Sequence, residues 1–127
     1  MEKIIITTEN APSPIGPYNQ AIKVGNTLYI SGQIPLIPTS MKLLNGSIIQ
    51  ETELVMKNLE AILDAAKMSF NDVVKSTIFL TDMEDFTKVN EVYENFFDNS
   101  TAPARETIAV KSLPKFVRIE ISMIATA

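Results

Sequence analysis

A long amphipathic segment set among β-rich runs constrains the fold of this chain more than any other feature. Ser47 and Gln50 match the capping-box pattern with which helices often begin. Apolar residues then recur at helical spacing, at Val55, Leu59, Ile62, Leu63 and Ala66. The pattern predicts a helix from about Ile48 to about Lys67. Because a helix with one apolar stripe must bury it against another layer, we expect the β-rich runs to form a sheet beneath it.

The segments around this helix have the composition and two-residue period of strands. Strands are predicted at Ala21–Val24, Leu28–Gly32, Val73–Thr81, Arg105–Val110 and Phe116–Ile124. Gly25-Asn26 separates the first two, which is typical of a hairpin. In the last strand, alternation assigns Val117, Ile119, Ile121 and Met123 to an apolar face and Arg118, Glu120, Ser122 and Ile124 to the other.

A second helix is predicted to begin at Asp82 and to end before Pro103. Its core-facing stripe consists of Phe86, Val89, Tyr93, Phe96 and Phe97. The order of elements is then β-β-β-α-β-α-β-β, which includes one further strand before the first helix. This order predicts one domain over residues 1–127, of the α+β class, with two helices packed on one face of a mixed sheet.

The absence of both cysteine and histidine among the 127 residues excludes several kinds of chemistry. Thiol nucleophiles, Ser-His-Asp triads and zinc sites of the His/Cys type all need one of these residues. The net charge of −4 disfavours nucleic acid as a partner. No apolar run is long enough for a membrane span or a signal-peptide core, so we expect a cytoplasmic protein, unless a missing N-terminal extension directs it to an organelle.

The two arginines, Arg105 and Arg118, are the most informative charged residues, because lysines are far more numerous. Arg105 begins a predicted strand, and alternation places Thr107 on its side. A guanidinium group binds a carboxylate through two parallel hydrogen bonds. A substrate clamp and a structural pair with an acid are equally compatible with this position.

Several polar residues occupy positions that structure or function could explain. Glu120 lies mid-strand, where burial of a carboxylate is costly unless it meets water, a partner or a ligand. The alternation of the strand favours a Glu120 side chain that points to solvent beside Arg118. Asn90 lies within the apolar stripe of the second helix and needs hydrogen-bond partners, which favours a structural role. Tyr18 follows the rigid Gly16-Pro17 turn.

Two further features have simple local explanations. Ser31-Gly32 closes a strand, and the glycine permits close approach of another group. The acids Asp82, Glu84 and Asp85 are better explained by helix capping than by a metal site, and no metal is expected.

Several sequence blocks in one order resemble the RidA (YjgF) family of reactive intermediate enamine/imine deaminases. The blocks are Thr8-Glu9-Asn10-Ala11-Pro12, Ile15-Gly16-Pro17-Tyr18, Ile30-Ser31-Gly32-Gln33-Ile34-Pro35, Phe79-Leu80-Thr81-Asp82-Met83, Val89-Asn90-Glu91-Val92-Tyr93, Pro103-Ala104-Arg105, Leu113-Pro114-Lys115 and Ile119-Glu120-Ile121. They extend over nearly the whole chain. Thr107 departs from the family pattern, since many members have cysteine there.

The resemblance implies a chorismate-mutase-like fold and a homotrimer with clefts between neighbouring subunits. In the family these clefts hydrolyse small 2-imino or enamine acids, such as 2-aminoacrylate and 2-iminobutanoate, to 2-keto acids and ammonia, and no cofactor is needed. By the same resemblance, Arg105 is the carboxylate clamp and Glu120 places the water. The residues implied to line the pocket are Tyr18, Ser31, Gly32, Asn90 and Thr107.

Two other functions compete with this interpretation. The family also has an endoribonuclease or translation-inhibitor label, but a chain without histidine and with acidic net charge lacks the usual acid/base pair and the attraction for phosphate. A non-catalytic trimer that only binds metabolites, or acts like a chaperone, would have the same carboxylate clamp as an enzyme.

Overall fold

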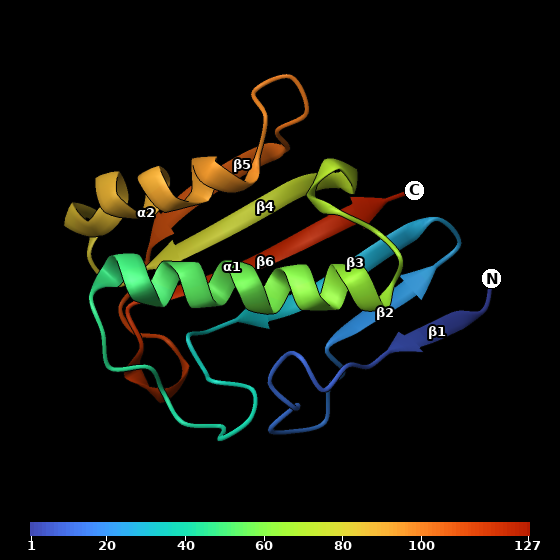
Figure 1. Cartoon of the computed structure of the whole chain (residues 1–127), viewed down its shortest axis with the longest axis horizontal. Helices are drawn as coiled ribbons and strands as arrows, with labels where there is room; N and C mark the ends of the chain where they lie inside the picture. Colours follow the sequence, from blue (N-terminus) through green and yellow to red (C-terminus); the bar gives the residue numbers. More distant parts are fainter.

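Two helices lie across one face of a six-stranded mixed sheet in the computed structural model, which describes residues 1–127 (Figure 1). The elements are β1 (Lys3–Ile6), β2 (Ala21–Val24), β3 (Thr27–Gln33), α1 (Ile48–Ala65), β4 (Val73–Leu80), α2 (Phe86–Tyr93), β5 (Ala104–Ala109) and β6 (Ile119–Thr126). The predicted class and order of elements are confirmed. Neither helix is long and apolar enough to cross a membrane.

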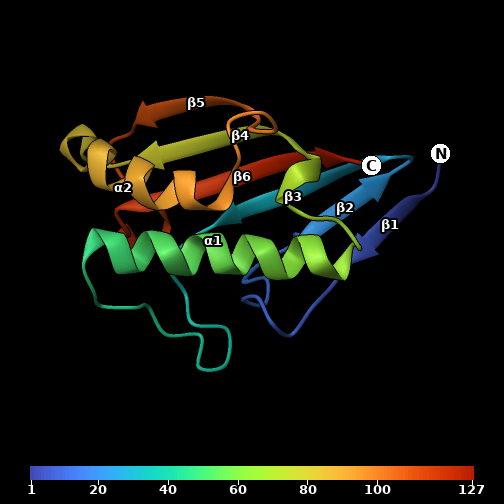
Figure 2. The ribbon, with the colours of Figure 1, turned by 45° about the horizontal axis from the view of Figure 1, so that its top comes forward.

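The order of strands across the sheet is β1-β2-β3-β6-β4-β5. Neighbouring strands are antiparallel except β4 and β5, which are parallel. The predicted hairpin joins β2 to β3, and Gly25 in its turn has a φ of +58°, a conformation that glycine adopts without steric cost. The edge strands are β1 and β5, so β5 has one unpaired side (Figure 2).

The core lies between the helices and the sheet. The helical stripe Val55, Leu59, Ile62 and Leu63 is fully buried, as is the strand face formed by Ile119, Ile121 and Met123. Both predicted apolar faces are therefore confirmed. The α1 capping box is also confirmed, because the Ser47 hydroxyl accepts from Gln50 N and the Gln50 side chain accepts from Ser47 N.

The other face of the sheet is not covered by either helix (Figure 2). In register, Tyr29 pairs with Ile124, and Phe79 pairs with Glu120, so these side chains share the uncovered face. Large apolar groups remain exposed there, including Tyr29 at 51% and Ile108 at 43%. A sheet face with this much exposed apolar surface is suited to burial against another molecule.

Helix α1 ends at Ala65, close to the predicted end near Lys67, where the backbone adopts a left-handed φ of +59°. Two other predicted boundaries are wrong, each for a local conformational reason. Asp82 caps a 3₁₀ turn, accepting from Glu84 N at 2.9 Å, and α2 itself begins at Phe86. The last strand begins at Ile119 and not at Phe116, because Lys115 and Phe116 have positive φ angles, which are incompatible with a β-strand.

Within the acidic cluster at 82–85, Asp82 has the predicted capping function, at the start of the 3₁₀ turn, whereas Asp85 precedes α2 without a side-chain capping bond.

Candidate active site

One cavity of about 510 Å³ contains four of the seven predicted site residues. These are Tyr18, Ser31, Gly32 and Glu120. The β1–β2 loop, the end of β3 and the turn that precedes β6 form its walls. Its volume is in the range that accommodates a small organic ligand.

Glu120 presents a carboxyl group that no other group in the chain neutralises. It lies on the uncovered face of the sheet, half-buried, and neither a hydrogen bond nor an ion pair engages it. Burial raises the pKa of Glu120 above its ordinary value. A carboxyl group held in this way is suited to accept a proton from water and to return it.

Gly32 lies directly against this carboxyl group. A Cβ at position 32 would collide with Oε2 of Glu120, so any other residue there would force the Glu120 side chain to move. The predicted close approach at Ser31-Gly32 is therefore confirmed, and the group that approaches is Glu120.

A bulge in β3 produces this contact. The register changes from Ile30 opposite Met123 to Gln33 opposite Ile121, so two residues of β3 face one residue of β6. Ser31, in the bulge, donates its hydroxyl hydrogen to Asn19 O at 2.6 Å. The Ser31 hydroxyl therefore fixes the strand rather than pointing freely into the cavity.

Arg105 lies in a separate hollow between α2 and β5. Its Nη1 donates to Asn90 Oδ1 at 2.7 Å, and its guanidinium carbon lies 5.0 Å from the ring centroid of Tyr93 and 5.6 Å from that of Phe86. Aromatic faces and a neutral amide orient a guanidinium group without cancelling its charge. Of the two interpretations of Arg105, the pair with an acid is not present in this chain.

Tyr93, one of the two aromatic residues that contact Arg105, is itself held in place by a hydrogen bond. Tyr93 donates its hydroxyl hydrogen to Ser76 Oγ at 2.9 Å, and both residues are buried. Burial raises the pKa of Tyr93, against the smaller opposing effects of Ser76 and Arg105, so the phenol stays neutral beneath the guanidinium group. Asn90 lines the same hollow and binds the Arg105 side chain, rather than holding a loop to the helix.

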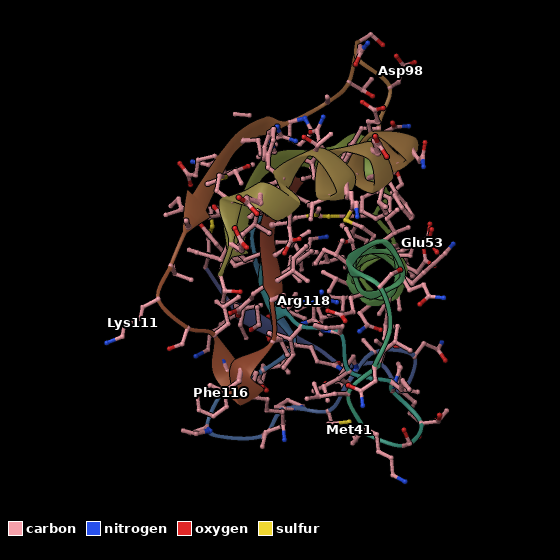
Figure 3. All side chains as sticks on the ribbon, turned by 90° about the vertical axis from the view of Figure 1, so that its left-hand side faces the viewer. Met41, Glu53, Asp98, Lys111, Phe116 and Arg118 are labelled. Carbon is pink, nitrogen blue, oxygen red and sulfur yellow. The ribbon has the colours of Figure 1, made fainter.

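Arg118, in contrast, is engaged by an acid. Its Nε donates to Glu51 Oε1 at 3.2 Å, its Nη2 donates to the other oxygen of Glu51 and to Gly46 O at 2.9 Å, and Glu51 is buried. Figure 3 shows Arg118 between the start of β6 and α1. The expectation that Glu120 lies beside Arg118 is therefore wrong, because Arg118 reaches toward the helix.

The structure separates the predicted site residues into two groups on opposite faces of the sheet. Arg105 pairs with Ser76 in the β4–β5 ladder and Thr107 pairs with Ile78, so both lie on the helix-covered face, with Asn90 above them. Glu120 lies on the uncovered face. Arg105 and Glu120 consequently face different hollows within a single chain.

Thr107 carries a buried hydroxyl oxygen without a hydrogen-bond partner, the one such side-chain atom in the chain. Buried polar atoms are nearly always satisfied, and an unsatisfied one costs stability. Its position one alternation from Arg105 puts this free hydroxyl on the same face as the guanidinium group.

Sequence reasoning missed three polar residues of the cavity, Gln20, Gln33 and Lys115. Gln20 and Gln33 are buried amides. A signal for Gln20 was present, because the preceding loop contains Pro12, Pro14 and Pro17 and therefore lacks N–H groups to satisfy its own carbonyls.

Comparison with known proteins shows the family of the chain. The family model described as Endoribonuclease L-PSP matches residues 8–127. The chain belongs to this family, the Rid (YjgF) family. A RutC family protein of Pyrococcus horikoshii is 54% identical over 123 residues, which are 97% of each chain. The resemblance drawn from the sequence blocks is confirmed.

Two further relatives carry more specific descriptions. The 2-iminobutanoate/2-iminopropanoate deaminase of Mus musculus is 48% identical, over 95% of this chain and 89% of the mouse protein. The crystal structure of E. coli TdcF with bound serine has a TM-score of 0.91 and 40% identity, over 98% of each chain.

Proposed function

We propose that this protein hydrolyses reactive 2-imino and enamine acids, such as 2-iminobutanoate and 2-aminoacrylate, to 2-keto acids and ammonia, without a cofactor. The observation that carries the proposal is the pair of uncompensated groups: a guanidinium group without an acid partner and a half-buried carboxyl group without a donor. A 2-imino acid has a carboxylate at one end and a basic nitrogen at the other, so it complements both.

The two groups require assembly to act on one substrate. They lie on opposite faces of the sheet within a chain, and the uncovered face exposes apolar side chains suited to an interface. We infer a homotrimer in which Arg105, Asn90 and Thr107 of one subunit complete the Glu120 cavity of its neighbour. In this arrangement the site is made of Arg105 and Glu120, with Tyr18, Ser31, Gly32, Asn90 and Thr107 around the substrate.

Relatives support the substrate class. The mouse protein is named a 2-iminobutanoate/2-iminopropanoate deaminase, and TdcF was crystallised with serine. Serine has the carboxylate and the α-nitrogen that a 2-imino acid presents.

The proposed reaction is an addition followed by an elimination. Arg105 holds the substrate carboxylate while the Glu120 carboxylate accepts a proton from water, whose oxygen bonds to C2 as the C=N electron pair moves to nitrogen. Glu120 returns this proton to the nitrogen and so forms the carbinolamine. Glu120 then takes the hydroxyl proton and passes it to the nitrogen as the C2–N bond breaks, which leaves the 2-keto acid and ammonia. An enamine first tautomerises to the imine, gaining a proton on carbon and losing one from nitrogen. A positioned acid/base group supplies about 10²–10⁴-fold, which is sufficient because an imine already hydrolyses in water.

The test generates 2-iminobutanoate in situ with a threonine dehydratase and follows 2-ketobutanoate formation. Wild type is expected to accelerate the reaction, and Arg105→Ala is expected to lose most of this effect. Absence of acceleration by wild type would contradict the proposal. Binding of 2-ketobutanoate without acceleration would favour a metabolite-binding protein, and RNA cleavage abolished by Arg105→Ala would favour the endoribonuclease interpretation.

A subunit-mixing experiment tests the shared site. Arg105→Ala and Glu120→Gln are each expected to be nearly inactive alone. Co-expressed in equal amounts, they should recover about one quarter of wild-type activity, because half of the subunits offer an intact arginine and half an intact glutamate. No recovery in a confirmed mixed trimer would mean that the two groups do not act across an interface.

A further inference from the structure

We propose that Gln20 is a positioning residue that holds the β1–β2 loop in the shape that forms one wall of the Glu120 cavity. The inference rests on the proposed function of that cavity. Gln20 itself lines the cavity, makes no side-chain hydrogen bond to Glu120, and acts by fixing the backbone of the loop.

The Gln20 side chain is buried and forms hydrogen bonds to several backbone groups of this loop, which is the dark blue coil below the sheet in Figure 1. We call this set of side-chain hydrogen bonds the Gln20 bracket. Its Nε2 lies 2.9 Å from Thr8 O, 3.2 Å from Ala11 O and 2.9 Å from Pro12 O. Its Oε1 accepts from Thr8 N at 2.8 Å. One amide therefore fixes both the start and the middle of the loop.

The composition of the loop explains why an amide is needed. Pro12, Pro14 and Pro17 have no N–H group, so the loop cannot satisfy its carbonyls as a regular element does. The amide of Gln20 both donates and accepts, which matches this mixture of groups. A carboxylate at this position would donate nothing and would repel the three carbonyl oxygens.

The bracket is connected to the reactive part of the cavity on two sides. Pro12, which it holds directly, and Tyr18, which lies farther along the loop, both line the cavity. On the other side, the backbone oxygen of Gln20 accepts from Ser31 N at 2.9 Å. Ser31 precedes Gly32, against which the Glu120 carboxyl group lies. Loss of the side-chain bracket therefore loosens the wall while leaving Glu120 in its strand.

A more mobile loop is expected to change substrate binding, and hence KM, more than the rate of the chemical step. If only a fraction of molecules has the competent wall, the apparent affinity falls by that fraction, whereas the bound complex reacts as before. We expect Gln20→Met to raise KM for 2-iminobutanoate about tenfold and to change kcat less than about threefold. Gln20→Asn, which keeps the amide but shortens its reach, is expected to have an intermediate KM.

The matched control is Val55→Ala. Val55 is fully buried in α1 and does not line the cavity, so the variant loses stability without touching the loop. Assayed well below its melting temperature, Val55→Ala should retain the KM and kcat of wild type. Gln20→Met should differ from it in KM even where the two variants have equal melting temperatures.

Limited proteolysis provides a readout that does not depend on turnover. The loop should resist cleavage in ligand-free wild type and be cut in Gln20→Met, and 2-ketobutanoate should slow cleavage of the variant because its binding restores the wall. Unchanged KM and unchanged cleavage in folded Gln20→Met would overturn the proposal, and if that variant fails to fold the same criteria apply to Gln20→Asn. An inactive wild type would contradict the proposed function instead, and the cleavage and 2-ketobutanoate protection would then decide the role of Gln20.

Discussion

The chain contains two sets of one arginine and one glutamate, of which one set forms an ion pair and the other does not. Arg118 and Glu51 are hydrogen-bonded to each other at the start of α1, and that pairing raises the pKa of Arg118. Arg105 and Glu120 lie on opposite faces of the sheet, one oriented by an amide and two aromatic rings, the other half-buried without a donor.

This difference separates a structural pair from groups available to a ligand. Charges that neutralise each other inside a chain connect its elements but offer little to a solute. Charges kept apart and uncompensated reduce the stability of the isolated chain, and they attract a ligand of complementary charge. The comparison therefore predicts that substitutions in the two sets affect different properties.

The largest expected effect is on activity, at Arg105. Arg105→Ala should lower kcat/KM for 2-iminobutanoate by about 10²–10⁴-fold, because it removes charge-assisted hydrogen bonds to the substrate carboxylate. Arg105→Lys should recover only part of this loss, since an ammonium group lacks the two-pronged geometry. Steady-state kinetics with the in situ imine assay measures both.

The matched variant is Arg118→Ala, which should keep activity within about threefold. It should instead lower the free energy of unfolding by about 1–3 kcal/mol, because Glu51 is left buried without its partner and Arg118 itself is partly exposed. An equal loss of activity in both arginine variants would remove the distinction between the two sets.

Glu120→Gln should lower kcat about 10²-fold, and its stability should change with pH. Burial raises the pKa of Glu120 in the folded protein, so ionisation is less favourable there than in the unfolded chain. Stability of wild type therefore declines relative to the variant as the pH rises through this pKa. Urea unfolding should show Glu120→Gln to be more stable near pH 7, with the gap closing toward pH 4; a gap that widens in acid would contradict the assignment.

Thr107→Val should change stability and activity in opposite directions. Removal of an unsatisfied buried hydroxyl should stabilise the chain by about 1 kcal/mol. If the hydroxyl meets the substrate in the assembled cleft, kcat/KM should fall about tenfold. Thr107→Ser serves as the control that keeps the hydroxyl, and increased stability with unchanged kinetics would mean that Thr107 takes no part in the site.

The smallest effect is expected at the aromatic support of Arg105. Phe86→Leu keeps an apolar side chain but removes one ring face, which contributes about 0.5–1 kcal/mol to holding the guanidinium group. KM should rise about two- to fivefold with little change in kcat. A KM equal to that of wild type would mean that Asn90 and Tyr93 suffice to orient Arg105.

Much of the fold could be predicted because its signals are local. The capping box at Ser47, the Gly25-Asn26 turn and the alternation around Ile121 each depend on residues close in the sequence. The predicted start of β6 is wrong because it depends on a backbone conformation that the side-chain pattern does not indicate. Left-handed backbones at Lys115 and Phe116 are unusual for residues with a Cβ, and nothing in their side chains announces them.

The sequence by itself determined the order of elements, the family and the identity of the few groups able to do chemistry without cysteine or histidine. Only the tertiary structure decided which arginine remains available. Arg118 meets Glu51 across 67 positions of the chain, and Arg105 is turned away from Glu120 by the register of β4 with β5 and with β6. Strand register decides the face of every side chain, and it is settled by long-range packing that no local pattern contains.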